Sequence, residues 1–218
     1  MKIDLHVHTS GISLCGHVSP EETLRLYGTT DYDGLVITNH YSRYIVRHHT
    51  ERTGRDFFEL YQEEFQKALL EGEKHNIKVF CGYELRFDGS DNDYLVYGLP
   101  EDLARKYDAL FSMTPEEFGA VAKERGFLFY QAHPFRNGMK IIRPDALSGI
   151  EIKNGHPRHD SRNDVAVLWA QKYHLHGIGG SDFHQKQDLG TSGILTRQSV
   201  NSLEDLLKVL RKDLYTVF

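Results

Sequence analysis

Histidines and carboxylates recur in this chain at the points where short apolar runs end. His6 and His8 lie near the beginning of the chain, and Asp182 and His184 lie near its other end. Residues two apart in a strand point to the same side, so each pair presents two donor atoms together. Imidazoles and carboxylates gathered in one place are the ligands that a borderline divalent metal ion requires. The spacing therefore predicts a metal site built from strand ends.

Three further donors lie between these two pairs, each after a short β-branched or aromatic run. They are His40, Glu84 and His133. A single His-x-His would be weak evidence, but donors at five strand ends in order form a strong pattern. Pointing such side chains into a common pocket is unfavourable unless they find a partner or a metal ion.

The elements that position these donors alternate between strand and helix with short connections, as repeated β–α units do. Strands are predicted at residues 2–8, 33–38, 77–85, 94–98, 127–132, 149–153 and 177–180, with a short strand ending at residue 218. Helices are predicted from residue 20, over 55–74, 114–125, 162–174 and 202–212. Polar residues at successive strand ends favour a closed or nearly closed barrel, whose active site lies at the carboxyl ends of the strands. An open doubly wound sheet is the alternative, but it would not collect ligands from nearly every strand.

Several local patterns support these boundaries. Ser19 and Glu22 are expected to form a capping box at the first helix, and the run from Thr114 to Glu117 repeats that pattern. The helix at 162–174 is expected to bury three apolar side chains, and residues 41–55 are interpreted as a polar connection or a lid over an anionic substrate. The three side chains are Val165, Leu168 and Trp169.

Size and composition suit a single domain over residues 1–218. The net charge of −5 gives no global basic surface, so extended nucleic-acid binding is disfavoured without being excluded. Two cysteines are too few for a disulfide framework, and no apolar stretch is long enough for a signal or a membrane span. A cytoplasmic location is therefore expected.

Taken together, the motifs resemble the polymerase-and-histidinol-phosphatase (PHP) family of metal-dependent phosphoesterases. The resemblance is carried in order by Asp4–Ser10, Val36–His40, Gly82–Glu84, Ala132–Pro134 and Gly180–His184. It implies a distorted (β/α)7 TIM-like barrel with a two- or three-metal centre of zinc, manganese or iron at the C-terminal face of the strands.

The resemblance also assigns the metal ligands. It implies that one ion is bound by His6, His8, Glu84 and Asp182, with Glu84 bridging to a neighbouring ion.

A further ion would be bound by His40 and His184, and His133 would be a ligand on the Glu84 side.

The chain departs from the family pattern in two places. Members of the family often have an Asp or His ligand soon after the first pair, and here the candidates are Cys15 and His17, of which His17 is preferred. A thiolate would favour a softer metal than an imidazole does. Many members also have a His after the Glu84 strand, where Asp93 could take its place or the third metal could be lacking.

Charged residues near the strand ends could handle the substrate or orient the ligands. Arg136 and Arg158 follow two of the strands, and a planar guanidinium can bind two phosphate oxygens at once. Glu151 could be a metal ligand or a carboxylate that fixes the orientation of a ligating histidine, and Asp4 could be such a carboxylate or simply a residue at the strand edge.

The leading hypothesis is hydrolysis of a phosphate ester, most simply a small anionic phosphomonoester, by a metal-activated water. A nuclease acting on nucleic-acid ends stays open within this hypothesis. A metal-dependent amidohydrolase is a second possibility, although no middle strand ends in a suitably placed lysine. A catalytically idle metal-binding module is a third.

Overall fold

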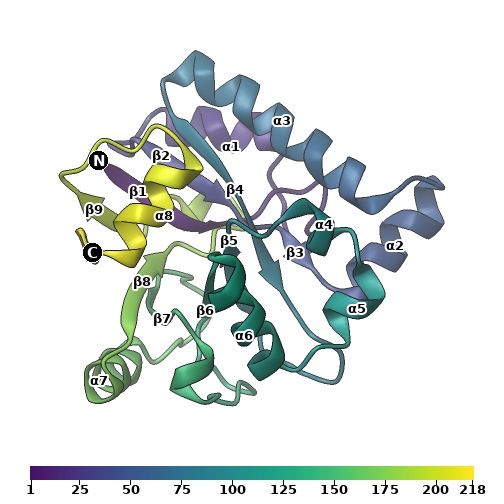
Figure 1. The fold of residues 1–218 in the computed structure, drawn as a ribbon. Helices are drawn as coiled ribbons and strands as arrows, with labels where there is room; N and C mark the ends of the chain where they lie inside the picture. The colour runs from purple at the N-terminus through teal and green to yellow at the C-terminus, as the bar shows by residue number, and fades with distance from the viewer.

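The strands form one ten-stranded sheet that curls into a nearly closed barrel in the computed structural model, which describes residues 1–218 (Figure 1). The strands are β1 (Lys2–Val7), β2 (Gly34–Ile37), β3 (His40–Tyr41), β4 (Lys78–Leu85), β5 (Tyr94–Tyr97), β6 (Leu128–Gln131), β7 (Gly149–Asn154), β8 (His176–Gly180), β9 (Ile194–Thr196) and β10 (Tyr215–Val217). Their order in the sheet is β10-β9-β1-β2-β4-β5-β6-β7-β8, and β3 pairs with β4. The predicted barrel-like α/β fold is confirmed.

The sheet closes into a barrel where β1 lies beside the segment that follows β8. The backbone N–H of His8 donates to the carbonyl of Phe183 at 2.9 Å, and that of Phe183 donates to the carbonyl of His6 at 3.2 Å. Gly180 permits this approach, because a Cβ there would lie 2.7 Å from the backbone nitrogen of His6. Residues almost 180 positions apart are thereby brought side by side.

The barrel is distorted because one strand runs against its neighbours. β5 is antiparallel to both β4 and β6, whereas β1, β2 and β4 are mutually parallel and so are β6, β7 and β8. β9 and β10 extend the sheet beyond β1 as antiparallel strands.

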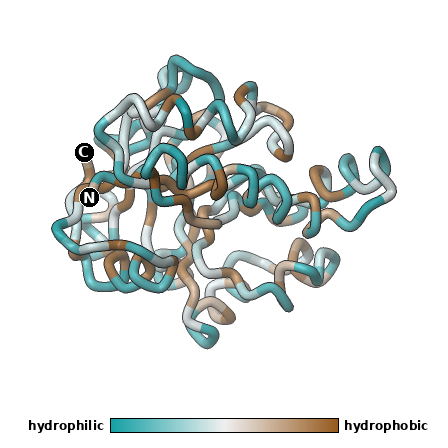
Figure 2. Tube along the Cα trace, turned by 90° about the horizontal axis from the view of Figure 1, so that it is seen from above, coloured by the Kyte–Doolittle hydropathy of each residue, from teal (hydrophilic) through white to brown (hydrophobic).

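Helices surround the sheet (Figure 1). They are α1 (Pro20–Tyr27), α2 (Arg43–Thr53), α3 (Phe57–His75), α4 (Glu101–Ala104), α5 (Tyr107–Phe111), α6 (Pro115–Arg125), α7 (Asn163–Tyr173) and α8 (Leu203–Arg211). Figure 2 shows hydrophilic stretches along the outer helices and apolar stretches toward the strands. No helix is long and apolar enough to cross a membrane.

The helix caps follow the sequence with one exception. Thr114 and Glu117 form the expected capping box of α6. Ser19 caps α1 by accepting from the backbone N–H of Glu22, but the Glu22 side chain pairs with Lys186 at 2.9 Å instead of returning to the cap. The expected capping box at α1 is therefore wrong in its second half.

Residues 41–55 and α7 differ from the sequence-based expectation. Most of the expected polar connection is α2, which begins after the capping residue Ser42 and ends at Gly54 in the left-handed conformation. In α7 the buried side chains are Ala166 and Ala170, whereas Leu168 is 65% exposed. The helix packs on β7, and small alanine side chains on the facing surface allow that close approach. Val165 is also exposed, so the prediction that α7 buries its large aliphatic residues is wrong.

Candidate metal centre

Four donor side chains converge at the end of the barrel where β1 meets β8. The Nε2 atoms of His6 and His8 lie 3.1 Å apart. Glu84 places one oxygen 3.2 Å from the Nε2 of His6 and the other 3.3 Å from that of His8. The Oδ1 of Asp182 lies 3.4 Å and 3.5 Å from the same two nitrogens. We call His6, His8, Glu84 and Asp182 the inner cluster. All four are buried.

The hydrogen-bond partners of the two imidazoles direct their lone pairs into the inner cluster. The Nδ1 of His6 lies 3.0 Å from a carboxylate oxygen of Glu151, which can only accept a proton from it. The Nδ1 of His8 lies 2.9 Å from the hydroxyl of Ser13, whose own proton is donated to Asn39. Both rings therefore carry a proton on Nδ1 and direct the lone pair of Nε2 toward a metal ion in the inner cluster. Partners of this kind fix the tautomer of metal-ligating histidines.

The charges of the inner cluster favour binding of a cation. Burial opposes a positive charge on His6, but the attraction of Asp182, Glu151 and Glu84 outweighs it and holds the pKa of His6 well above its usual value. Burial likewise opposes a negative charge on Asp182, yet the neighbouring imidazoles hold the pKa of that carboxyl well below its usual value. Two Nε2 atoms and two ionised carboxylates at these distances fit a divalent metal ion.

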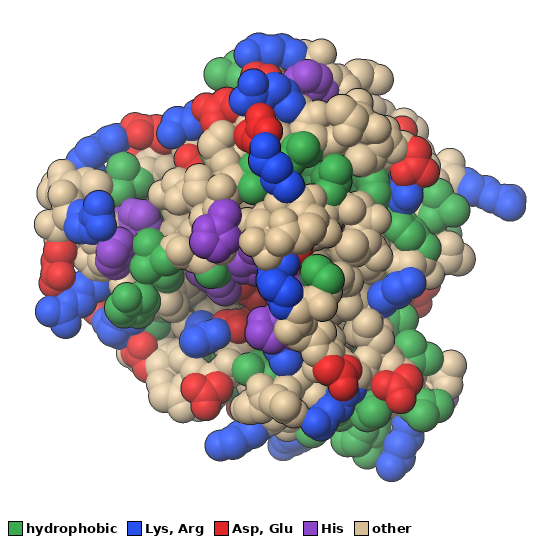
Figure 3. Space-filling model, turned by 180° about the vertical axis from the view of Figure 1, so that it is seen from behind, with side chains coloured by type: hydrophobic (Ala, Val, Ile, Leu, Met, Phe, Trp, Pro, Cys, Tyr) green, Lys and Arg blue, Asp and Glu red, His purple; other side chains and the backbone are tan.

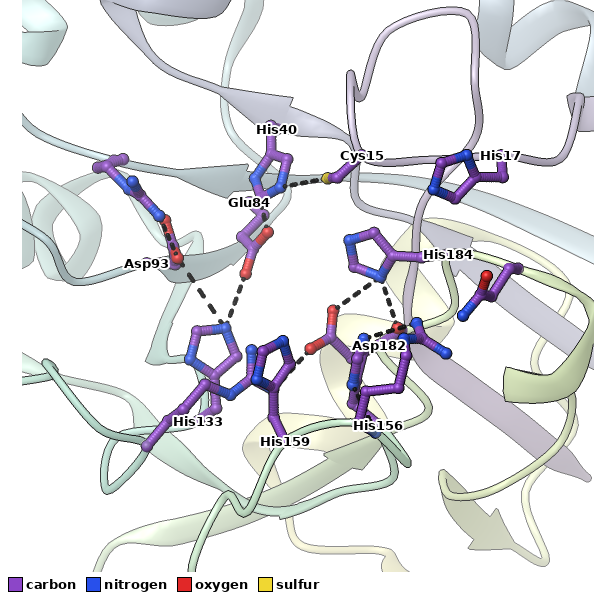
Figure 4. Close-up of a pocket in the computed structure, with 14 residues that line it drawn as sticks. Cys15, His17, His40, Glu84, Asp93, His133, His156, His159, Asp182 and His184 are labelled. Atoms are coloured by element: carbon purple, nitrogen blue, oxygen red, sulfur yellow. Dashed lines mark hydrogen bonds and ion pairs between the residues drawn. The ribbon is translucent and has the colours of Figure 1, made fainter.

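Glu84 joins the inner cluster to a second set of donors (Figure 4). Its Oε2 lies 2.8 Å from the Nδ1 of His40, and its Oε1 lies 3.2 Å from the Nε2 of His133. Although Oε2 is buried, it accepts no hydrogen bond of good geometry. Such an orphaned oxygen beside imidazoles fits a carboxylate that shares its two oxygens between ions, as the sequence resemblance implies for Glu84.

His184 completes a further group of donors. Its Nδ1 lies 2.7 Å from the backbone carbonyl of Asp182, to which it can only donate, so its Nε2 carries the lone pair. Burial and the neighbouring imidazole of His8 lower the pKa of His184 to about 3, which keeps the ring neutral. Donor atoms of His184, His8 and His40 all lie within 4.8 Å of one another.

Two of these residues have a positive φ angle, a backbone conformation that residues other than glycine rarely adopt. The φ angles of His133 and Asp182 are 29° and 53°. Such conformations cost about 1–3 kcal/mol and are concentrated at functional sites. The His133 backbone is held by its N–H, which donates to Glu151 at 2.9 Å.

The remaining ligand candidates lie at different depths in one cleft of about 360 Å³. Cys15 contacts the Nε2 of His40 at 3.2 Å. His17 is exposed at the rim and makes no side-chain hydrogen bond, although its backbone N–H donates to His184. Asp93 is buried and forms a two-pronged ion pair with Arg86, both at 2.7 Å. Figure 3 shows histidines in and around this hollow, with arginine or lysine side chains beside them.

The two predicted phosphate-binding arginines both line the cleft, but their partners differ. The Nη2 of Arg136 donates to Asp182 at 2.8 Å and to Asn154 at 2.9 Å, while its Nη1 has no partner. Arg158 uses both terminal nitrogens on Asp188, and one of them also lies 2.8 Å from the Nε2 of His156. Arg136 therefore keeps one terminal nitrogen without a partner, whereas both terminal nitrogens of Arg158 contact Asp188.

Asp4 and Glu151 act as supports, as the sequence suggested for such carboxylates. Asp4 accepts from the backbone N–H groups of His6 and Ser181 and from the hydroxyl of Tyr27, so it ties β1 to the chain after β8. Burial raises the pKa of Asp4 to about 6. Glu151 holds the ring of His6.

Sequence reasoning missed Asn154 as a member of the site. Its amide nitrogen donates to Glu151 at 3.0 Å and to Asp182 at 3.2 Å, and its amide oxygen accepts from Arg136. Strict alternation would place residues 151 and 154 on opposite faces of β7. An irregularity in the pairing with β8 between Glu151 and Lys153 puts both on the inner face.

His156 and His159 also line the cleft, and sequence reasoning left them unassigned. His156 is buried, and burial together with the charges of Arg158 and Arg136 lowers its pKa to about 4. Donor atoms of His156, Asp182 and His184 lie within 4.8 Å of one another. The available signal was their position directly after a strand that already carried a predicted carboxylate.

Comparisons with known proteins find similarity in part of the sequence and in the fold. Residues 160–213 match the family model described as PHP-associated. The fold is similar to that of a two-domain protein containing a predicted PHP-like metal-dependent phosphoesterase from Bacteroides vulgatus, with 20% identity and a TM-score of 0.72. That match covers 100% of this chain and 64% of the other, so this chain spans less than two thirds of it.

Two other solved structures are similar over nearly the whole chain. PsfC from Pseudomonas syringae has 20% identity and a TM-score of 0.72, with 100% of this chain and 90% of PsfC covered. The lesion-specific endonuclease Q from Pyrococcus furiosus has 13% identity and a TM-score of 0.66, with 99% of this chain and 57% of the endonuclease covered. The comparison with curated proteins found no match. The sequence match covers residues 160–213, and the similarity to the solved structures shows that the chain has the fold of these proteins.

Proposed function

We propose that this protein is a metal-dependent phosphoesterase that hydrolyses a small phosphomonoester with a metal-activated water. The observation that carries the proposal is the inner cluster, in which two imidazole Nε2 atoms 3.1 Å apart meet two buried carboxylates. The sets of donors joined by Glu84 would hold two or three divalent ions of zinc, manganese or iron. We also infer that residues 1–218 act as one PHP-like domain.

The metal ions would lower the pKa of a coordinated water toward neutrality and offset the charge of the phosphoryl oxygens. The protein's own groups supply the geometry. Glu151 and Ser13 hold the rings of His6 and His8, so their lone pairs need no reorientation. Arg136 and Asn154 engage the Oδ2 of Asp182, which leaves Oδ1 to the inner cluster.

Arg136 is also placed to meet the substrate. It lines the cleft, and its unpaired Nη1 can donate to a phosphoryl oxygen while Nη2 stays on Asp182. We assign Arg158 a second position along the cleft, where it could contact an anionic substrate while its terminal nitrogens stay on Asp188. A cleft of about 360 Å³ favours a small substrate over a long polymer.

The test is an assay of the purified protein on a panel of phosphomonoesters and on single-stranded and duplex oligonucleotides, before and after treatment with a chelator. We expect release of phosphate from a monoester, loss of this activity on chelation, and recovery on addition of zinc or manganese. Hydrolysis of oligonucleotides alone would contradict the substrate class. Activity that persists after complete metal removal, verified by elemental analysis, would contradict the mechanism.

A further inference from the structure

The loop after β1 carries a thiol that reaches the edge of the donor cluster. Cys15 is exposed, and its Sγ lies 3.2 Å from the Nε2 of His40 (Figure 4). His40 also faces the buried Oε2 of Glu84 through Nδ1 and shares a group of donor atoms with His8 and His184. Cys15 is the only sulfur in the cleft.

The separation of sulfur and nitrogen suits two ligands of one ion. With metal–sulfur and metal–nitrogen bonds of about 2.3 Å and 2.05 Å, two ligands lie about 3.1 Å apart at a right angle and about 3.6 Å apart at a tetrahedral angle. The observed 3.2 Å between Cys15 and His40 falls in that range. The other ring nitrogen of His40, Nδ1, faces the buried Oε2 of Glu84 at 2.8 Å, so the imidazole lies between Cys15 and the carboxylate of the inner cluster.

The position of Cys15 is fixed by the same contacts that orient the histidines. Ser13, two residues earlier, bonds the Nδ1 of His8, the amide oxygen of Asn39 and the backbone N–H of His40. Gly16, the next residue, packs against the backbone of Thr9, where a Cβ would lie only 2.9 Å from the carbonyl carbon. The loop is thus pinned to the metal centre on both sides of Cys15.

His17 lacks these features. Like Cys15, it is exposed and belongs to none of the groups of three or more donors, but its side chain makes no hydrogen bond, whereas the Sγ of Cys15 contacts the Nε2 of His40. We propose that Cys15, and not His17, is the metal ligand supplied by the loop after β1, and that this protein's centre therefore contains a thiolate-bound ion. This inference rests on the metal centre of the proposed function but not on the reaction.

A thiolate ligand changes the chemistry of the centre. Soft sulfur favours zinc over magnesium or manganese at that position. It also makes the site chemically accessible, because an exposed cysteine can be alkylated or oxidised unless a metal ion holds its sulfur.

The direct test replaces the metal ions with cobalt(II), whose absorption spectrum reports on sulfur ligands. We expect the cobalt-loaded protein to show a thiolate-to-cobalt charge-transfer band in the near ultraviolet, and Cys15→Ser to lose it. The chain has only two cysteines, so Cys81→Ser is the matched control and should keep the band. His17→Ala should keep it as well.

A second measurement uses the unmodified protein, in case a variant fails to fold. Mass spectrometry should show that iodoacetamide alkylates Cys15 in metal-free protein and that bound zinc protects it at least about tenfold, with Cys81 as the internal reference. Visible cobalt bands without the charge-transfer band, together with equal alkylation in the presence of zinc, would overturn the assignment of Cys15 and leave the metal centre intact. Failure to bind cobalt or zinc at all would overturn both.

Discussion

The inner cluster and the rim of the cleft are built in opposite ways. Every member of the inner cluster lies in a strand or within two residues of the end of one, and His6 and His8 are 0% exposed. The rim comes from loops and includes His17, His159 and Arg158, all of which are exposed. Hydrogen bonds to Glu151, Ser13 and Asn154 hold the inner donors in place before any ligand arrives. The contrast indicates that the barrel determines the metal chemistry, whereas the loops determine what is bound beside it.

The largest effect is expected from removing an inner ligand. His6→Ala should lower kcat/KM by more than about 100-fold, beyond the 10–100-fold typical of residues that only support a ligand. It should also lower the metal content measured by elemental analysis. His17→Ala, the matched substitution at the rim, should change kcat/KM by less than about tenfold. Equal losses of kcat/KM and metal content in the two variants would contradict the distinction between the inner cluster and the rim.

Removal of the metal from the inner cluster should lower the free energy of unfolding of the protein. A metal present at 100 times its dissociation constant adds about 2.7 kcal/mol to the free energy of unfolding. For a chain of this size that corresponds to a rise in Tm of about 5–10 °C. Calorimetry with and without zinc would measure it, and His6→Ala should show a much smaller rise. An identical Tm for the metal-loaded and metal-free protein would speak against a buried site.

Asn154 tests whether the supports of the inner cluster matter. Asn154→Ala removes hydrogen bonds to Asp182 and Glu151, so metal affinity or activity should fall by about 10–100-fold. Metal titration monitored by calorimetry would give the affinity. Asn137→Ala, in an exposed loop, is the matched control and should behave as wild type. Unchanged metal affinity and activity in Asn154→Ala would show that Arg136 alone suffices to hold Asp182.

The contrast explains how much of the site could be predicted from the sequence. The inner cluster follows from the two-residue repeat of a strand, which places His6 with His8 on one side. Asn154 does not follow, because the irregularity in β7 breaks that repeat. The contact between Cys15 and His40 depends on the path of a loop, which composition does not determine.

In the fold, too, some elements could be predicted from the sequence and others could not. Strands with apolar runs and helices with clear caps were predicted close to their observed bounds. α2 was missed because it buries only Ile45, so it has no apolar stripe to detect. Its local support is the Ser42 cap, an Arg47–Glu51 pair one turn apart and the terminating Gly54. α7 was assigned the wrong buried face because its contact with β7 is made by alanines.

A smaller effect should separate the two arginines of the cleft. Arg136→Lys loses the contacts of Nη2 with Asp182 and Asn154 and should lower kcat by about tenfold, since a lysine ammonium cannot hold these partners and also offer a second nitrogen to the phosphoryl group. Arg158→Lys, farther from the inner cluster, should act mainly on KM. Steady-state kinetics of both variants would measure the split. The reverse pattern would place the phosphoryl group beside Arg158.

The smallest change in stability is expected on the exposed face of α7. Leu168→Ser should change the free energy of unfolding by no more than about 0.5 kcal/mol, because the side chain is 65% exposed. Ala166→Leu, on the buried face of α7, should destabilise the protein by about 1–3 kcal/mol through overpacking. Denaturant unfolding of both variants would measure the difference. A larger loss in Leu168→Ser would mean that another surface covers this helix.

The most direct test of the account is anomalous diffraction from crystals of the zinc- or manganese-loaded protein. We expect a metal peak within about 2.0–2.3 Å of ligand atoms from His6, His8, Glu84 and Asp182. A second peak should lie on the far side of Glu84. Crystals grown in excess metal that show no ion among these four side chains would contradict the central claim.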